Sequence, residues 1–430
     1  MGYSKEEAII EASRCLNCKN PTCISGCPAS NNIPLFIKYI KEDDLEAAYS
    51  TIRLTSNMPE ICSRVCDQAK QCEGSCIRSK NGEAVAIGML ERFVCDNVSK
   101  NAAEPQYFSK KVAIIGSGPA GLSCAEELNL LGYEVTVFEQ KNRFGGLLTY
   151  GIPNYRLPYN IVINKINYLE AAGIKFKNNV TFGKNFNFKD LKNEGYDAIF
   201  VAVGATKAKY MRIPGEDLTY FYTSDEILES ISKNTKRNDD SFTPILFGKV
   251  AVIGGGNSAI DVARSAIRLK DVKSVDIIYR RTKEDMPAAV IEVEEAINEG
   301  VKLNTLINPI EILEGINKRV SGIKCVKMFQ TEVGSDGSRG VKPIENSEFS
   351  LKFDNVIYAI GNDCESYLSK FDEIEVSKWN TILVNKDGQS TKDTSIFAAG
   401  DVVTGPATVV KAMSDGKKIA HNIDKFLKNI

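Results

Sequence analysis

Two groups of closely spaced cysteines could carry redox or metal chemistry in this chain. Eight of its twelve cysteines fall between Cys15 and Cys76. The spacings are Cys15-x2-Cys18-x4-Cys23-x3-Cys27-Pro28 and Cys62-x3-Cys66-x5-Cys72-x3-Cys76. Thiolates this close together oxidise to disulfides or bind metal. The cysteine groups are therefore the first candidate site.

A glycine-rich stretch after the cysteines has the form of a dinucleotide-binding turn. It reads Gly116-Ser117-Gly118-Pro119-Ala120-Gly121 and follows an apolar run at 111–115. Gly116 allows a tight turn, Gly118 lets a pyrophosphate approach the backbone, and Gly121 allows close packing of helix on strand. Glu139 ends the next predicted strand, where an acid can accept hydrogen bonds from a ribose.

Two further features favour FAD as the ligand of this first turn. Arg143-Phe144-Gly145-Gly146 extends the loop after Glu139, and we expect the segment 145–153 to line a flavin ring. Near the other end, the predicted strand 395–399 closes on Gly400-Asp401. This resembles a second FAD fingerprint, in which the aspartate binds the ribityl chain. The alternative for Asp401 is a helix N-cap.

A second glycine cluster, Gly254-x-Gly256-Asn257-Ser258-Ala259, follows another apolar run and predicts the site of the reductant. The next predicted strand, 274–279, ends in Arg280 and Arg281 rather than in an acid. Guanidinium groups at this point suit a 2′-phosphate, so NADPH is favoured over NADH. The alternative is a pair of solvated arginines. Further cofactor contacts are expected at Leu147, Gly151, Arg156, Gly204, Gly361 and Thr408.

The cysteines admit three interpretations. The N-terminal residues lack the apolar core of a signal peptide, so we expect a cytoplasmic protein, in which disulfides are disfavoured. Two zinc sites of four cysteines each are possible. Two [4Fe-4S] clusters fit better, because Cys27-Pro28 matches the ferredoxin pattern in which the fourth cysteine precedes a proline. A neighbouring flavin would supply the electrons. Cys95, Cys124, Cys325 and Cys364 are isolated, and no CxxC lies in either nucleotide unit, which argues against disulfide reduction.

Composition excludes several other classes of protein. His421 is the single histidine, so a Ser-His-Asp hydrolase, a Cys-His protease or a histidine-ligated zinc site is very hard to build. Hydride transfer between nicotinamide and flavin needs no protein acid or base, and no catalytic side chain is predicted. The net charge of −1 gives no sign of nucleic acid or an anionic membrane as a partner. No apolar run reaches the length of a membrane span.

The pattern of apolar residues predicts three domains of an α/β protein. Residues 1–108 are expected to be helical, with helices over 6–16, 33–40 and 44–54 and a linker over 99–111. An FAD-binding domain is expected at 109–245 and 355–430, and an NAD(P)H-binding domain at 246–354, both Rossmann-like. Residues 230–249 are predicted to be a surface connection and 333–347 a hairpin.

Nearly the whole chain resembles the small subunit of glutamate synthase and its relatives. These include the NADPH-oxidising half of dihydropyrimidine dehydrogenase and the large subunit of NADH-dependent ferredoxin:NADP oxidoreductase. The resemblance is carried by Arg14-Cys15-Leu16-x-Cys18-Lys19-Asn20-Pro21, Gly146-x3-Tyr150-Gly151-Ile152-Pro153-x-Tyr155-Arg156-Leu157-Pro158, Tyr279-Arg280-Arg281-x4-Met286-Pro287 and Gly400-Asp401-Val402-Val403-Thr404-Gly405. It implies two [4Fe-4S] clusters in the helical domain and an NADPH domain inserted into the FAD domain.

The resemblance also implies a set of cluster ligands. One cluster takes Cys15, Cys18, Cys23 and Cys76, and the other takes Cys27, Cys66, Cys72 and Glu91. Counting of thiols alone favours Cys62 as the eighth ligand, and the resemblance makes it a bystander. A carboxylate is a harder ligand than a thiolate and should shift the cluster potential.

We therefore expect a flavin and iron–sulfur electron-transfer subunit that oxidises NADPH and passes single electrons to a partner. The expected partner is a larger FMN- and iron–sulfur-containing glutamate synthase subunit. Alternatively the chain is the large subunit of an electron-bifurcating NADH-dependent ferredoxin:NADP oxidoreductase, with a small flavoprotein reductase subunit as partner and ferredoxin as a further electron carrier. A third alternative is a stand-alone NADPH:acceptor oxidoreductase. A zinc-stabilised scaffold without enzymatic activity is the alternative from a different class.

Overall fold

The cysteine-bearing segment is helical, as predicted, and the computed structural model has no strand within residues 2–98. Its helices are α1 (Lys5–Ser13), α2 (Thr22–Gly26), α3 (Ile33–Lys41), α4 (Leu45–Arg53), α5 (Pro59–Val65) and α6 (Ile87–Asn97). Short 3-10 turns at Gln68–Lys70 and Ile77–Lys80 flank the last cysteines of the second group. Phe36 and Ile40 of α3 pack on Ile52 of α4 and Leu90 of α6 in a small apolar core.

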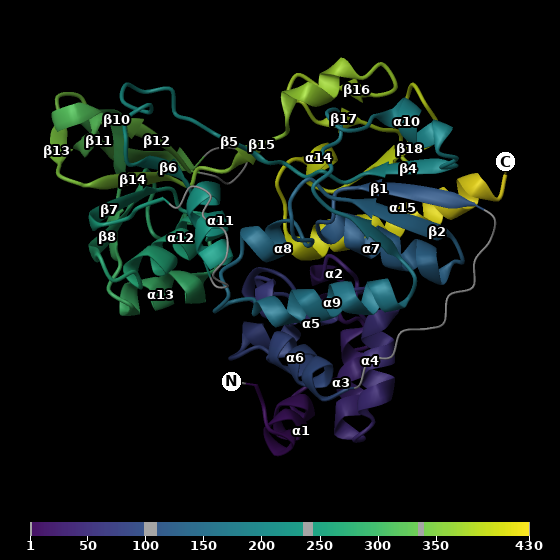
Figure 1. Cartoon of the computed structure of the whole chain (residues 1–430). Helices are drawn as coiled ribbons and strands as arrows, with labels where there is room; N and C mark the ends of the chain where they lie inside the picture. Colours follow the sequence, from purple (N-terminus) through teal and green to yellow (C-terminus); the bar gives the residue numbers. More distant parts are fainter. Residues whose placement is uncertain (1, 99–109, 235–243, 334–338, 430) are drawn as a thin grey trace. The chain divides into compact units, whose positions relative to one another are not determined.

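The structure describes residues 2–98, 110–234, 244–333 and 339–429, which form two units (Figure 1). Unit 1 consists of Met1–Thr149, Asn154–Lys207 and Asp363–Ile430, and unit 2 of Tyr150–Pro153 and Ala208–Asn362. The chain passes between the units in the two-residue strands β5 (Lys207–Ala208) and β15 (Asn362–Asp363). The three-domain division remains a prediction, and the predicted linker 99–111 lies almost wholly outside the described residues.

Unit 1 contains a parallel sheet with the strand order β18-β4-β1-β2-β3. Its strands are β1 (Lys111–Ile115), β2 (Glu134–Phe138), β3 (Lys175–Lys177), β4 (Ala198–Val201) and β18 (Ile396–Ala398). The inner strands β1 and β4 are apolar and buried almost throughout, because a parallel sheet is covered on both faces. That is why the unbroken apolar run 111–115 predicted β1, whereas β4 was not predicted.

Two long helices lie side by side along one face of this sheet, α7 (Pro119–Leu130) and α15 (Val409–Leu427) (Figure 1). The remaining helices of the unit are α8 (Leu147–Tyr150), α9 (Tyr159–Ala171), α10 (Phe188–Asn193) and α14 (Asp401–Thr404). The helical segment joins this part of the unit through α5, which contacts α9 and α15. A second apolar cluster covers the other face, where Phe182 and Phe188 pack with Leu368. A strand pair, β16 (Glu375–Val376) and β17 (Ile382–Leu383), lies near it.

Unit 2 contains a second parallel sheet with the order β6-β14-β7-β8-β9. Its strands are β6 (Phe221–Thr223), β7 (Gly248–Ile253), β8 (Val272–Tyr279), β9 (Lys302–Thr305) and β14 (Asn355–Tyr358). The strands β6 and β14 lie outside the predicted range 246–354, so this sheet extends beyond that range on both sides. The helices of the unit are α11 (Ser224–Asn234), α12 (Asn257–Ile267) and α13 (Val290–Asn298).

Alternate residues of β7 face two different layers in unit 2. Val250 and Val252 join the core under α12, whereas Ala251 and Ile253 pack against an antiparallel sheet that contributes Ile323. This side-to-side alternation is the two-residue period of a strand. The antiparallel sheet contains β10 (Ile307–Glu314), β11 (Val320–Val333), β12 (Arg339–Pro343) and β13 (Phe349–Leu351). The predicted hairpin is the β11–β12 pair, and its residues 334–338 are outside the described part.

These layers confirm the predicted fold class, an α/β chain with two Rossmann-like sheets after a helical segment. The predicted surface connection 230–249 was partly wrong, because α11 continues to Asn234 and β7 begins at Gly248. Short apolar patterns at element ends did not reveal these boundaries. None of the helices in the described residues is long and apolar enough to cross a membrane.

Candidate functional site: two glycine turns and a cysteine-lined pocket

The predicted cofactor residues gather at the carboxyl ends of parallel strands. In unit 1 Gly116 follows β1, Glu139 follows β2, Gly204 follows β4 and Gly400 follows β18. In unit 2 Gly254, Arg280 and Gly361 come after β7, β8 and β14. Open α/β sheets bind ligands at this edge, where loops and helix N-termini meet. Each unit therefore has a candidate nucleotide edge of its own.

The first glycine turn leaves its backbone open at the middle glycine. Gly116 has a φ of +105°, and a Cβ there would lie 2.4 Å from Ala202 O. A Cβ on Gly121 would lie 2.0 Å from Gly116 O, so helix and strand pack without room for a side chain. Gly118 caps α7, and a Cβ on it would meet nothing within 4 Å. The free space at Gly118 and the first N–H groups of α7, which begins at Pro119, fit a pyrophosphate.

Glu139 is buried beside this turn. Its Oε2 accepts hydrogen bonds from Ser117 N at 3.1 Å and Ser117 Oγ at 2.6 Å, and its Oε1 accepts from Lys141 N at 2.9 Å. Ser117 Oγ also accepts from Gly145 N at 3.0 Å. A carboxylate has about four acceptor positions, so Glu139 keeps capacity for a ribose hydroxyl. Gly146 packs on the same turn, since a Cβ there would lie 2.9 Å from Gly118 Cα.

The segment from Gly400 to Thr408 also lies against the first turn of α7. A Cβ on Gly400 would lie 3.1 Å from the Cβ of Ala120. Asp401 Oδ1 accepts a hydrogen bond from Ala407 N at 3.1 Å, and burial raises the pKa of the Asp401 carboxyl. The alternative of an N-cap for Asp401 is wrong, because Gly400 occupies the cap position of α14 without a side-chain bond. Thr408 caps α15 by accepting from Lys411 N at 3.3 Å.

The other expected cofactor contacts in this region have different settings. Leu147 begins α8 and is 44% exposed, which leaves an apolar surface for a ring. Arg156 is half-buried in the turn before α9. Gly204 and Gly361 have φ values of +75° and +93°, and a Cβ on either would meet nothing within 4 Å. Gly151 lies in the segment Tyr150–Pro153, which groups with unit 2. All of these assignments remain predictions.

The second glycine turn repeats the design of the first within unit 2. Gly254 has a φ of +147°, and a Cβ there would lie 2.2 Å from Ala359 O. Gly256 caps α12, and a Cβ on it would meet only Pro287 Cγ, at 4.0 Å. Asn257 and Ser258 are exposed in the first turn of the helix. The turn again offers open backbone and free helix N–H groups to a phosphate.

Arg280 and Arg281 directly follow β8 at the same edge. Arg280 is exposed, whereas Arg281 is half-buried and its buried Nε makes no hydrogen bond to any described residue. A buried guanidinium N–H without an acceptor is costly, and an anionic ligand would supply one. This feature of Arg281 supports a 2′-phosphate site, and the assignment of the pair to that phosphate remains a prediction.

One set of cysteines lines a single pocket in the helical segment. Cys15, Cys18, Cys23 and Cys76 form its thiol wall, and the rest of the lining is largely apolar, including Ile33 and Ile87. Burial raises the pKa of the Cys23 thiol to about 11, and the neighbouring Cys76 and Cys15 add to this effect. A thiol with so high a pKa becomes a thiolate ligand only beside a cationic centre such as a metal. These four residues are the ones that the resemblance assigned to one cluster.

The second set is more deeply buried and contains five possible ligands. Cys27, Cys66 and Cys72 lie in electrostatic range of Glu91, whose pKa burial raises to about 8. Asn31 Nδ2 donates to Glu91 Oε1 at 3.4 Å. The thiol of Cys62 contacts that of Cys66 and is the main cause of the raised pKa of Cys66. The structure thus keeps both Cys62 and Glu91 near the set, and the choice between them remains a prediction.

The arrangement fits a polynuclear cluster better than a single ion. Tetrahedral zinc needs four ligands about 2.0–2.3 Å from one point. The first set instead surrounds a pocket, as a cluster with one thiolate for each iron requires.

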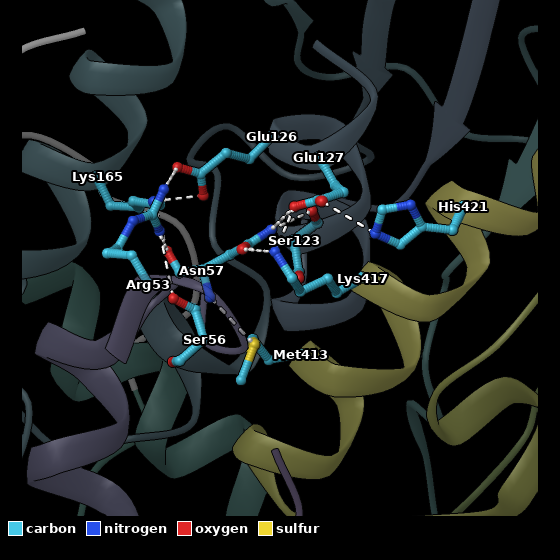
Figure 2. Close-up of polar contacts among 10 residues, drawn as sticks. All are labelled: Arg53, Ser56, Asn57, Ser123, Glu126, Glu127, Lys165, Met413, Lys417 and His421. Atoms are coloured by element: carbon cyan, nitrogen blue, oxygen red, sulfur yellow. Dashed lines mark hydrogen bonds and ion pairs between the residues drawn. The ribbon is translucent and has the colours of Figure 1, made fainter. Parts of the chain in front are cut away.

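A buried polar network, which sequence reasoning missed, links the helical segment to α7 (Figure 2). Glu126 of α7 forms ion pairs with Arg53 at 2.5 Å and with Lys165 of α9 at 2.6 Å. The carbonyl of Asn57 accepts from both of these cations at 2.6 Å. Burial alone would raise the pKa of Glu126, but the two cations hold it below its usual value. No periodic pattern marks these charges as internal.

The neighbouring residue of α7, Glu127, extends this network toward α15 (Figure 2). Lys417 Nζ donates to Glu127 Oε2 at 2.5 Å and to Asn57 Oδ1 at 2.9 Å. The single histidine, His421, has its Nε2 3.1 Å from Glu127 Oε1. The helix that carries the first glycine turn is therefore held by polar contacts to Arg53 of α4, to Asn57 in the turn between α4 and α5, and to α9 and α15. These contacts fix the turn relative to the cysteine segment within unit 1.

Two family models match this chain. Residues 1–103 match the model described as dihydropyrimidine dehydrogenase domain II, 4Fe-4S cluster. Residues 110–416 match the model described as pyridine nucleotide-disulphide oxidoreductase. The second model covers more than half of the chain. The first covers the segment that contains both cysteine groups.

Individual proteins resemble the chain over most of its length. The glutamate synthase [NADPH] small chain of Azospirillum brasilense is 36% identical over 444 residues, which cover 99% of this chain and 90% of the relative. The NADP(+)-dependent formate dehydrogenase subunit beta of Moorella thermoacetica is 36% identical over 94% of this chain and 60% of its own length. The structure of the oxidoreductase FprA of Mycobacterium tuberculosis has a TM-score of 0.63 at 19% identity, over 74% of this chain and 85% of that one. This last likeness concerns the fold alone.

Proposed function

Because this chain belongs to the family of glutamate synthase small chains and related iron–sulfur NAD(P)H oxidoreductases, we propose that it is the NADPH-oxidising subunit of a glutamate synthase. The chain is an oxidoreductase with an FAD- and NADPH-binding region and a 4Fe-4S domain, so a non-enzymatic zinc scaffold is not proposed. In this role it takes electrons from NADPH and delivers them singly to a larger subunit.

The residues at the two sheet edges have distinct parts in this proposal. Gly118 and the N-terminus of α7 hold the FAD pyrophosphate, and Glu139 and Asp401 accept hydrogen bonds from its sugar and ribityl hydroxyls. Gly256 and the N-terminus of α12 hold the NADPH pyrophosphate, and Arg280 and Arg281 bind the 2′-phosphate. When bound, the flavin exchanges hydride with nicotinamide and single electrons with clusters. The protein supplies binding and orientation, without an acid or base.

The cysteine-bearing segment supplies the outward path in the proposal. Cys15, Cys18, Cys23 and Cys76 hold one [4Fe-4S] cluster, and Cys27, Cys66, Cys72 and Glu91 hold the other. The observation that carries the proposal is the presence of two open glycine turns and a thiol-lined pocket in one chain. A hydride site alone would not need the eight thiols, and thiols alone would not need two nucleotide edges.

A different partner is the second candidate. The relative from Moorella thermoacetica is the beta subunit of an NADP(+)-dependent formate dehydrogenase, and its identity to this chain, 36%, equals that of the glutamate synthase relative, over a smaller share of its own length. The same electron-transfer subunit can therefore serve another large partner. The bifurcating alternative, with a small flavoprotein reductase subunit, belongs to this second group of proposals.

Two measurements test the proposal in sequence. Protein purified without oxygen should contain FAD with about eight iron and eight sulfide per chain, and NADPH should bleach the flavin absorbance. Absence of iron would refute the outward path. The native complex, isolated under the same conditions, should contain a large subunit that makes glutamate from glutamine and 2-oxoglutarate. A complex with a formate-oxidising or a small flavoprotein subunit would refute the assignment to glutamate synthase.

A further inference from the structure

The segment that follows β8 folds back over the second glycine turn. The Tyr279 ring lies so close to Gly255 that a Cβ there would be 2.4 Å from Tyr279 Cε2. Ala288 N donates to Gly255 O at 3.2 Å, and Ala289 N donates to Asn257 Oδ1 at 3.1 Å. Both ends of the loop 280–287 are thus tied to the turn. Because Arg280 and Arg281 begin this loop, its conformation decides where their guanidinium groups can reach.

Asp285 closes the loop from within. Its Oδ2 accepts hydrogen bonds from Thr282 Oγ1 at 2.8 Å, from Thr282 N at 3.3 Å and from Gln330 Nε2 of β11 at 2.5 Å. The carbonyl of Asp285 accepts from Tyr279 Oη at 2.9 Å. These bonds join the start of the loop, its middle and the neighbouring antiparallel sheet. One carboxylate oxygen therefore accepts three hydrogen bonds that stabilise the loop, in addition to the backbone bonds from Asp285 N to Thr282 O and from Met286 N to Lys283 O, both at 3.2 Å.

The other carboxylate oxygen is not used in this way. Among the described residues, Asp285 Oδ1 accepts no hydrogen bond. The Thr282 hydroxyl, together with Gln330 and Arg281, keeps the pKa of the Asp285 carboxyl below its usual value, so the group is anionic at neutral pH. Arg280 and Arg281 attract a 2′-phosphate, whereas a carboxylate in electrostatic range of Arg281 repels one. The loop thus contains both cationic groups that attract a 2′-phosphate and an anionic group that repels it.

We propose that Asp285 sets the nucleotide preference of this site through two separable effects. Through Oδ2 it positions the arginine loop for the 2′-phosphate of NADPH. Through its negative charge it limits the affinity that the 2′-phosphate adds, so that the site also accepts NADH. The inference rests on the proposed assignment of Arg280 and Arg281 to the 2′-phosphate. Asp285 is thus a positioning and specificity-determining residue, distinct from the arginines.

Two substitutions at this position separate the effects. In Asp285→Asn the amide oxygen can keep the two shorter bonds, from Thr282 Oγ1 and Gln330 Nε2, and the charge disappears. The ratio of affinity for adenosine 2′,5′-bisphosphate over 5′-AMP should rise by about three- to tenfold. In Asp285→Ala the hydrogen bonds that position the loop are lost together with the charge. The affinity ratio should therefore fall below that of the unaltered protein by a similar factor. Affinity for 5′-AMP should stay within about twofold in both variants, which also shows that unit 2 is folded.

Titration calorimetry of the holoprotein measures both ligands without turnover. Gln330→Leu gives a matched control, because it removes one hydrogen bond to Asp285 but leaves the charge, and it should lower the ratio. Equal ratios for Asp285→Asn and the unaltered protein, or a fall in both Asp285 variants, would overturn the inference. The combined change Arg280→Ala and Arg281→Ala must abolish the preference for the bisphosphate. If it does not, the 2′-phosphate assignment fails, and the present inference fails with it.

Discussion

Replacement of Glu126 by glutamine should destabilise unit 1 more than any loss of a surface charge pair. The side chains of Glu126 and Lys165 are 3% and 4% exposed, and Glu126 uses one oxygen for Arg53 and the other for Lys165. Glutamine offers one acceptor and one NH2 donor, so one buried cation would face a donor. Breaking a buried ion pair from one side costs about 3–5 kcal/mol.

Two further variants allow the losses in folding stability to be ranked. Lys165→Met removes one cation and leaves Glu126 paired with Arg53, so it should cost about 1.5–3 kcal/mol, the range for hydrogen bonds to charged groups. Lys175→Met removes an exposed cation whose partner is Glu134, with side chains 62% and 28% exposed. This matched control should cost less than about 1 kcal/mol.

Hydrogen exchange followed by mass spectrometry suits this comparison, because a chain of two units does not unfold in one step. Peptides from α4, α7 and α9 should lose protection in the order Glu126→Gln, Lys165→Met, Lys175→Met. The folded pKa of Glu126 is lowered, so its stabilising effect is present above its unfolded pKa and is lost as the pH falls through the folded value. Glu126→Gln should remove this acid-dependent part. Equal protection in Glu126→Gln and Lys175→Met would refute the reasoning.

Three other predictions concern the cofactor sites. Gly121→Ala places a Cβ 2.0 Å from Gly116 O, so the purified protein should lose most of its flavin by absorbance, whereas Gly2→Ala, at a position with open space around its Cβ and no positive φ, should retain it. Cys62→Ala should keep the full iron and sulfide content, and loss of half of each would make Cys62 the eighth ligand. Glu91→Ala should lower the iron content or shift the potential of one cluster in redox titrations, and an unchanged titration would remove Glu91 from the ligand set.

Much of the fold could be predicted because its strands are buried on both faces. The run 111–115 coincides with β1, and the strand predicted at 135–139 is β2, displaced by one residue. Local turn chemistry also identified both glycine turns, since their function depends on residues that are neighbours in the sequence. Features of this kind can be recognised without knowledge of distant contacts.

The parts that sequence reasoning missed depend on contacts between distant segments. Glu126 and Glu127 are adjacent acids on α7, and a reading of the helix alone would place them in solvent, yet both are buried and contact α4, α9 and α15. Of the antiparallel sheet β10–β13, only a hairpin was predicted. The pairing of β13 with β11 could not be read locally, because β12 lies between these two strands in the sequence. The pairing of β6 with β14 joins residues on either side of a long insertion. Local periodicity contains no information on such pairings.

The contact between α7 and α15 has a consequence for how the protein is made. Gly416 of α15 approaches so closely that a Cβ on it would lie 2.1 Å from Ala120 O, in the first turn of α7. The ribosome must synthesise all of unit 2 before α15 exists to cover that turn. Until then the first turn of α7 in a nascent chain lacks its cover, so we expect FAD to be taken up by the completed polypeptide rather than during its elongation.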